Sequence, residues 1–378
     1  MKKVIASTLA ALSLSTTAAV AGDPIPVFAH ADKMKFSALT YIGYKYNDFD
    51  TTLGDGTPNT REDTSQFEIR RAYLQVKGYF TENTKSYYRV TLDVHQDNKI
   101  DTTSNDTTDG DNLLRLKYAF MYLDEVLPYT GLEVGIAHRP WHDYEEHNSW
   151  YFRNISKVLV EDKNAGDLSN SADFGAMLKT ETKYFDMDAG IYNGEGYHAL
   201  QNKKGMSFEW RATAHILGVK GKDKQNKLTY WDASFFGQYN QEHKDVTVNT
   251  VTESQDLVFG GLHTVYNQPA FLLAAQYVYS QNTSDIANNV SGQAGQGYSG
   301  NGEFRFGSDY QYRVLARYDS WTPENSKKER KNMIAGFAWD QEKNVEWVAN
   351  VEKTDDETGS NRESYNGIAY MLTAQVSF

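Results

Sequence analysis

Apolar and polar residues alternate over the last nine residues of the chain. One parity is apolar and aromatic: Tyr370, Leu372, Ala374, Val376 and Phe378. The other parity is mostly polar, with Thr373, Gln375 and Ser377. A period of two indicates a strand with one apolar face. Because a strand of a soluble sandwich has the same pattern, this segment alone predicts only an amphipathic strand.

The same alternation recurs along the whole chain. The clearest repeats are residues 36–46, 88–94, 114–122, 208–216, 310–318 and 345–351. In 114–122 the apolar parity is Leu114, Leu116, Tyr118, Phe120 and Tyr122. In 67–78 the parity shifts midway, and a β-bulge near Arg70 and Arg71 would account for the shift.

The connections between these segments alternate in length. Long polar stretches lie at 47–64, 96–112, 139–170, 193–206, 241–255, 281–297, 321–331 and 353–364. Short ones lie at 80–85, 124–130, 182–184, 218–226, 267–269, 307–309 and 340–343. Eight long loops and seven turns predict sixteen strands. The glycines at 292–307 are interpreted as a flexible loop leading into a strand.

Alternating loop lengths favour an outer-membrane barrel over a sandwich, because such barrels have short periplasmic turns and long extracellular loops. A sheet in lipid must close on itself to pair all its backbone groups. We therefore predict an all-β fold: a closed antiparallel transmembrane β-barrel of sixteen strands. Aromatic residues near strand ends are expected to form its interfacial girdles: Tyr44, Tyr46, Tyr79, Phe80, Tyr122, Tyr129, Tyr279, Trp321 and Trp339.

The N-terminal stretch 1–21 has the features of a secretory signal peptide. Lys2 and Lys3 precede an uncharged run, and Ala19-Val20-Ala21 is a small-x-small cleavage site. A retained membrane helix is the alternative, but the run is short and rich in Ser and Thr. Residues 22–378 would then form the barrel, and its location would be the bacterial outer membrane.

Composition excludes several other classes. The chain contains no Cys, so disulfides and thiolate metal sites are excluded. It carries 50 acidic residues against 38 basic ones. A nucleic-acid partner is therefore not expected.

Three segments between residues 70 and 140 resemble the phosphate-selective porin O and P family. They are Arg70-Arg71-Ala72-Tyr73-Leu74-Gln75-Val76-Lys77-Gly78, Tyr88-Arg89-Val90-Thr91-Leu92-Asp93 and Glu133-Val134-Gly135-Ile136-Ala137-His138-Arg139-Pro140. The resemblance implies a sixteen-stranded, usually trimeric barrel whose third loop folds into the lumen. Phe378 is similar to the C-terminal aromatic residue by which outer-membrane barrels are recognised for assembly.

The expected lumenal wall carries charges of both signs. The pore-lining candidates are Arg89, Arg115, Lys117, Glu133, Glu209, Arg211, Arg313, Arg317 and Glu346. The family lines its pore with Arg ladders and Lys clusters, whereas this chain is acidic overall. The mixed wall leaves the choice between anion and cation selectivity open.

The stretch 139–170 is the longest connection and the richest in charged and aromatic residues. Its candidate constriction residues are Arg139, His142, Asp143, Glu145, Glu146, Arg153 and Lys157. Within a pore, such a loop would place strong fields at the narrowest point. The alternative is an ordinary solvated extracellular loop.

Motifs for catalysis, metals and cofactors are weak. His142 and His147 are one residue too far apart for a zinc-peptidase helix motif. No Gly-x-Ser-x-Gly elbow is present, although Ser, His and Asp all occur. We expect no catalytic residues, metal or cofactor.

The sequence therefore predicts a passive porin for small hydrophilic solutes or ions, with the anion or phosphate preference that the resemblance implies left undecided. The expected partners are outer-membrane lipid or lipopolysaccharide, the solutes themselves, and two further copies in a homotrimer. The alternatives are a surface-binding or adhesion barrel, and a hydrolase that uses the barrel as a scaffold.

Overall fold

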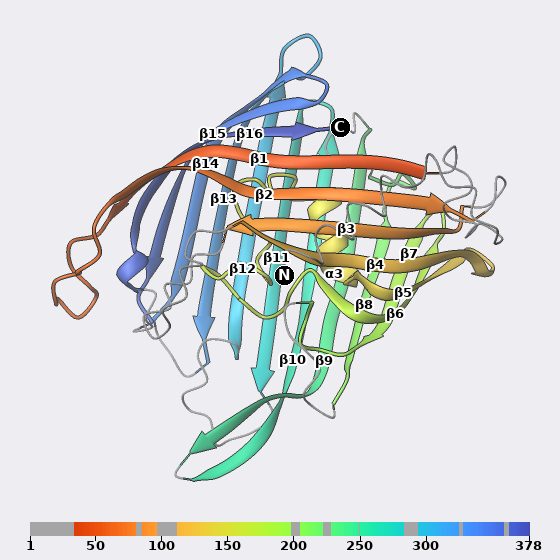
Figure 1. The fold of residues 1–378 in the computed structure, drawn as a ribbon, viewed down its shortest axis with the longest axis horizontal. Helices are drawn as coiled ribbons and strands as arrows, with labels where there is room; N and C mark the ends of the chain where they lie inside the picture. Colours follow the sequence, from red (N-terminus) through yellow and green to blue (C-terminus); the bar gives the residue numbers. More distant parts are fainter. Residues whose placement is uncertain are drawn as a thin grey trace, which may run out of the picture.

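The computed structural model describes residues 34–80, 85–96, 112–197, 205–221, 228–248, 250–282, 294–324, 328–358 and 363–378. The expected signal peptide, 1–21, lies outside these residues. Sixteen antiparallel strands form one closed barrel (Figure 1). The prediction of the fold and of the strand number is confirmed.

The strands follow one another around the barrel in chain order. In the first half they are β1 (Met34–Phe49), β2 (Thr64–Tyr79), β3 (Tyr87–Gln96), β4 (Asn112–Leu127), β5 (Thr130–His138), β6 (Ala172–Glu181), β7 (Phe185–Tyr192) and β8 (Ser207–His215). In the second half they are β9 (Tyr230–Val248), β10 (Val251–Gln268), β11 (Phe271–Asn282), β12 (Gly295–Phe306), β13 (Tyr312–Pro323), β14 (Arg330–Glu342), β15 (Val345–Asp356) and β16 (Gly367–Ser377). Within the described residues, the helix α3 (Pro140–Asn148) and a short 3-10 helix, η3 (Glu363–Tyr365), lie in the connections.

The barrel closes where β16 pairs with β1. Eleven residue pairs join the two strands, from Leu39 opposite Ser377 to Phe49 opposite Gly367. Beyond this ladder, the backbones of Ala38 and Phe378 exchange two hydrogen bonds, of 2.9 and 3.2 Å. Leu372 is exposed on the outer face whereas Thr373 is buried, as the alternation in the last strand predicts.

The two faces of the barrel wall differ in polarity. Large apolar side chains are exposed on the outside of most strands, for example Phe36, Leu74, Leu262, Leu273, Phe304 and Val314. Charged and amide side chains of the alternate parity are buried on the inside, for example Asp93, Arg211, Asn332 and Glu346. An apolar exterior around a sheet with no free edge fits the hydrocarbon core of a bilayer. The chain is therefore a transmembrane barrel of the outer-membrane type.

None of the helices in the described residues is long and apolar enough to cross a membrane.

Two β-bulges set which side chains enter the lumen. On β2, Tyr41 of β1 lies opposite Arg71 and Ile42 opposite Ile69, so Arg70 is the extra residue and the predicted bulge is confirmed. A second bulge on β4 makes Lys117 the extra residue, between the partners of Thr91 and Leu92. Because a bulge changes the parity, Leu114 and Leu116 point outward while Tyr118 and Phe120 are buried. The prediction of a single apolar face over 114–122 was wrong.

Most predicted connections match the structure, with two corrections. Residues 241–255 are largely strand, because β9 and β10 run on as a hairpin beyond the barrel (Figure 1). The sequence Val246-Thr247-Val248 and Val251-Thr252 is β-branched, which favours strands over a loop. The glycine-rich segment from Gly295 to Gly302 belongs to β12 instead of a loop.

The expected aromatic girdle is only partly present. Tyr44, Phe80, Tyr129, Tyr279 and Trp339 are exposed, whereas Trp321 is fully buried inside the barrel. Gly297 pairs with Trp321, and a Cβ at Gly297 would lie 2.6 Å from the Trp321 ring. A glycine at the facing position thus gives the indole room on the inner face.

Candidate functional site: a loop across the lumen

The connection from β5 to β6 folds into the barrel. Its helix α3 begins with Pro140 in the first turn, a position that suits proline because the first N–H groups of a helix have no intrahelical partner. The helix contacts β7, β8 and β9 and is seen inside the ring of strands (Figure 1). Its residues Trp141, His142 and Glu145 are almost fully buried. This connection, 139–171, is called the lumenal loop below.

Apolar packing fixes the lumenal loop against the inner wall. The indole of Trp141 stacks on the ring of Phe236 from β9, with centroids 3.6 Å apart and planes 3° from parallel. Gly261 of β10 lies opposite Phe236, and a Cβ there would come within 2.4 Å of the ring. Further apolar residues of the loop form one cluster with the inner faces of β9 to β11 and β13 to β16: Trp150, Phe152, Ile155, Val158, Leu159, Val160 and Leu168. The cluster fills the lumen on this side.

Polar contacts tie the same loop to strands around the barrel. Arg139 forms a bidentate ion pair with Glu209 of β8, with Nε 2.9 and 3.0 Å from the two carboxylate oxygens. The Tyr144 hydroxyl donates to Asp232 of β9 at 2.8 Å. Further contacts link Glu145 to Gln276, Ser149 to His263 and Asn301, and Ala165 to Arg330. These contacts on successive strands hold the loop in one position.

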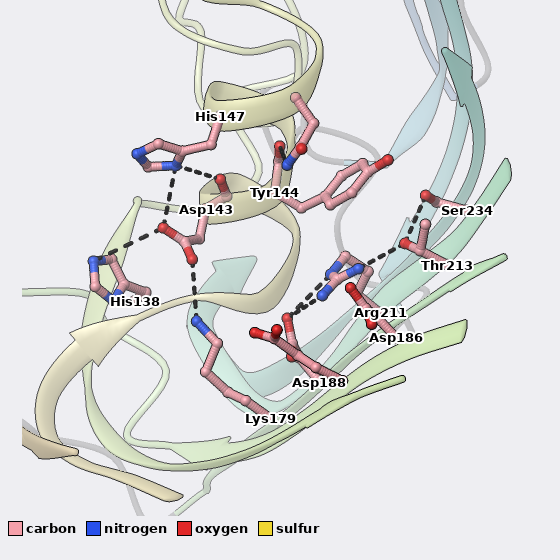
Figure 2. A network of polar contacts seen from close by, with 12 residues as sticks. His138, Asp143, Tyr144, His147, Lys179, Asp186, Asp188, Arg211, Thr213 and Ser234 are labelled. Carbon is pink, nitrogen blue, oxygen red and sulfur yellow. Dashed lines mark hydrogen bonds and ion pairs between the residues drawn. The ribbon is translucent and has the colours of Figure 1, made fainter. Parts of the chain in front are cut away.

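Asp143 joins the N-terminal half of α3 to β5 and β6 (Figure 2). Its carboxylate lies 3.2 Å from Lys179 Nζ, 3.3 Å from His147 Nδ1 and 3.8 Å from His138 Nε2. Beside this group, Arg211 pairs with Asp188 at 2.6 Å and donates to Thr213, also at 2.6 Å. The network connects the loop with four neighbouring strands, β5 to β8.

Burial decides which groups of the loop are charged. Enclosure lowers the pKa of His142 to about 3, so its imidazole is neutral at physiological pH. Burial also raises the pKa of Glu145 to about 8, which favours the protonated carboxyl, and that of Asp162 to about 6. His142 and Glu145, both constriction candidates, therefore present no charge to a solute at neutral pH.

The other constriction candidates form ion pairs, some with the barrel wall and some within the lumenal loop. Arg139 is 1% exposed and paired with Glu209, so it anchors the loop. Arg153 binds both Glu146 and Glu161, and Lys157 pairs with Glu161 at 2.9 Å. Glu146 and Arg153 line open space on the far side of the loop from its apolar cluster.

Two cavities lie along β1, β2 and β16 in the described part of the chain. The first, of about 400 Å³, lies toward the chain end of β16 and is lined by Tyr41, Tyr73, Arg89, Lys117, Tyr118, Glu146 and Arg153 among others. The second, of about 560 Å³, lies toward the connection of β1 with β2 and is lined by Lys45, Glu68, Arg61, Lys163 and Glu352 among others. They are called the turn-side and loop-side cavities below.

The lumenal loop touches the wall at the level between the two cavities. Arg70, the extra residue of the β2 bulge, donates to the carbonyl oxygen of Ile155 at 3.1 Å. The neighbouring Arg71 pairs with Asp93 at 2.8 Å. The sequence analysis named Arg70 and Arg71 as the place of a bulge and within the segment that carries the resemblance, but not among the pore-lining candidates. Because a bulge turns two consecutive side chains to the same face, the predicted bulge could have identified Arg70 and Arg71 as lumenal residues.

All nine pore-lining candidates lie on the inner face of the wall, and most are paired with opposite charges. Arg115 pairs with Asp93, Glu133 with Lys179, Glu209 with Arg139, Arg211 with Asp188, Arg313 with Asp340 and Glu346, and Arg317 with Asp319. Arg89 and Lys117 form no ion pair with a carboxylate in the described part of the chain. Arg89 contacts His138 and Thr91, and Lys117 contacts the Tyr73 hydroxyl.

The described residues contain no cluster of metal ligands, and their Ser149–His263 pair is not part of a catalytic triad. No group of three His, Asp or Glu residues there is arranged to hold a metal ion. Ser149 lies 3.1 Å from His263 Nε2, but His263 Nδ1 has no hydrogen-bond partner, so no described carboxylate completes a triad.

No family model matches the sequence, and no curated protein matches it. The fold is similar to solved outer-membrane proteins. A loop-deletion mutant of OmpT from Vibrio cholerae matches with a TM-score of 0.60 at 12% identity, covering 91% of this chain and 99% of that one. OprB from Pseudomonas putida at high pH matches with a TM-score of 0.61 at 10% identity, covering 93% and 96%. A mutant porin of Rh. blastica matches with a TM-score of 0.52 at 10% identity, covering 91% and 100%. The chain thus has the fold of an outer-membrane β-barrel.

Proposed function

We propose that the protein is an outer-membrane porin through which small hydrophilic solutes diffuse passively. The observation that carries the proposal is the pair of cavities along β1, β2 and β16, one on each side of the contact between Arg70 and the lumenal loop. A charged inner wall supports an aqueous passage, because such side chains stay hydrated in a water-filled lumen. In this proposal the lumenal loop sets the size limit.

The pairing of lumenal charges argues for weak ionic selectivity. Most inward guanidinium groups have a carboxylate partner, so the wall offers few of the unpaired cations that a phosphate filter needs. Lys117 and Arg89 are the exceptions in the turn-side cavity. We infer a modest preference for anions over cations, and no specificity for phosphate.

We also propose a homotrimer in contact with outer-membrane lipid. One of the matched OmpT structures is described as a trimer form, which supports the assembly. The exposed apolar outer face supports the lipid contact. Light scattering of the detergent-solubilised protein should give three chains per particle, and a particle of one chain would rule the trimer out.

Reconstitution in planar lipid bilayers tests the proposed function. Stepwise conductance increments are expected, with a reversal potential in a KCl gradient that indicates a slight preference for chloride. The absence of channels from folded protein would refute the porin proposal and favour the surface-binding alternative. A clear preference for potassium would refute the anion preference alone.

A further inference from the structure

The turn-side cavity brings unpaired cations and tyrosine rings together. Lys117 is 4% exposed, and its ammonium lies 4.8 Å from the ring centroid of Tyr73 and 5.2 Å from that of Tyr118. Its only hydrogen bond within the described residues is to the Tyr73 hydroxyl, at 3.5 Å. A buried ammonium without a carboxylate is costly, because burial removes its hydration shell. An anion entering the cavity would supply the missing counter-charge.

Arg89 provides a second cationic group on the same wall. Its guanidinium lies 4.8 Å from the Tyr118 ring centroid and contacts His138 Nε2 at 3.0 Å. His138 Nδ1 lies 3.1 Å from Glu133, and His138 Nε2 lies 3.8 Å from Asp143, which is paired with Lys179; neither acid forms an ion pair with Arg89 in the described residues. Glu133 is itself paired with Lys179. Arg89 therefore keeps donors for a carboxylate in the cavity.

The rest of the lining is aromatic and carries hydroxyl donors. Tyr41 and Tyr73 meet edge to face, with centroids 6.3 Å apart. In the described residues the hydroxyls of Tyr41 and Tyr118 have no hydrogen-bond partner. Glu146 is the acidic side chain among the lining residues, and it forms an ion pair with Arg153, which also binds Glu161. A planar ring can stack on tyrosines while its carboxylate meets Lys117 and Arg89.

We propose that the turn-side cavity is a binding site for small aromatic carboxylates on their way through the lumen. The passage itself rests on the proposed porin function, but binding does not. A cavity of about 400 Å³ holds a single-ring acid with accompanying water. Inorganic phosphate, which has no ring, would gain only the contacts with the cations and hydroxyls.

Ligand-detected NMR on the detergent-folded protein tests the site without requiring conduction. The probes are benzoate, cyclohexanecarboxylate (same charge, no aromatic ring), benzamide (ring without charge) and inorganic phosphate. Benzoate is expected to bind more tightly than each of the other three. Equal binding of cyclohexanecarboxylate, or displacement of benzoate by phosphate at equal concentration, would overturn the aromatic specificity.

The Lys117→Met variant should weaken benzoate binding by about tenfold or more, since a lost charged hydrogen bond typically costs that much. Lys77→Met is the matched control, because Lys77 also lies over a tyrosine ring on the inner wall, 3.4 Å from the Tyr87 centroid, but does not line the cavity. Loss of binding in both variants, or in neither, would overturn the assignment to this cavity. Arg89→Gln and the ligand series on the unmodified protein test the site if Lys117→Met does not fold.

Bilayer recordings separate the site from the porin function. Benzoate should reduce the chloride current of the unmodified channel and affect Lys117→Met much less. Specific benzoate binding without any conductance would retain the site and refute the porin. Conductance without specific binding would retain the porin and refute the site.

Discussion

Glu145 is a carboxyl group enclosed between α3 and the inner wall. It is 1% exposed, and the Gln276 amide donates to one of its oxygens while the other has no partner in the described residues. Burial raises its pKa to about 8, above the value of 4.5 for an exposed Glu. Between pH 4.5 and about 8, the Glu145 carboxyl is therefore protonated in the folded protein and ionised in the unfolded chain.

This proton makes the stability of the folded state depend on pH. The group stabilises the fold fully below pH 4.5, and its contribution is lost as the pH rises to about 8. The Glu145→Gln variant keeps a neutral side chain of the same shape and should remove this dependence. Urea unfolding in detergent from pH 5 to pH 8 should show the wild type losing more than about 1.4 kcal/mol relative to the variant, since each pKa unit corresponds to that amount. Parallel pH profiles would mean that Glu145 is ionised in the folded protein.

Arg70 is the second residue whose place has a measurable consequence. It connects the β2 bulge to Ile155 of the lumenal loop and also contacts the Met371 sulfur at 2.8 Å. Removing its side chain should widen the passage between the two cavities. Arg70→Ala is expected to raise single-channel conductance by tens of per cent in planar bilayers. Lys183→Ala, in the turn between β6 and β7, is the control that should leave conductance unchanged, and an unchanged or smaller conductance in Arg70→Ala would place the solute path elsewhere.

At the scale of elements, the alternation of apolar and polar residues, together with the alternation of long and short connections, was sufficient to predict sixteen strands. In a barrel wall, one parity faces lipid and the other faces the lumen, so the period survives even where individual residues vary. The pattern failed where a bulge shifted the parity at Lys117 and where glycines occupy both inward and outward positions of β12. It also could not locate the interior contacts of the lumenal loop, because the partner of Trp141 is Phe236, 95 residues away in the chain. That pairing depends on the closure of the barrel and leaves no local signal.

The stacked pair of Trp141 and Phe236 holds the lumenal loop against the wall. A buried Trp→Ala substitution typically costs about 3–5 kcal/mol. For Trp141 this cost should mainly weaken the docking of the lumenal loop against the wall, because the barrel strands remain hydrogen-bonded to each other. Trp141→Ala should therefore expose the loop to trypsin at Arg153, Lys157 or Lys163, sites that are protected in the wild type. Mass spectrometry of the fragments reads this out. Phe337→Ala, which removes an aromatic side chain from the lipid-facing surface, should leave the loop protected; equal cleavage in both variants would show that the stack does not fix the loop.

At the scale of the whole molecule, a closed sheet constrains sequence very little. Solved barrels at 10–12% identity cover more than nine tenths of this chain. Membrane-facing positions need only be apolar, and lumenal ones only polar and mutually paired, so many sequences satisfy the same architecture. In this chain most of the lumenal guanidinium groups are paired with carboxylates, whereas Lys117 and Arg89 in the turn-side cavity are not.

Closure itself depends on the register between β1 and β16, and the absence of native Cys allows a direct test. Thr40 lies opposite Val376, and the adjacent pair is Tyr41 with Gln375. Adjacent antiparallel pairs alternate between wide and narrow Cα separations, so at least one of the two double-Cys variants should form a disulfide on oxidation. The bridge would close a loop of almost the entire chain, and the heat-denatured, oxidised protein should migrate faster in gel electrophoresis than the reduced form.

The variant with Ile42→Cys and Val376→Cys is the control, because Ile42 lies opposite Ala374 and its diagonal distance to residue 376 is too long for a bridge. Efficient bridging in the control, or none in either matched pair, would contradict the register by which the barrel closes.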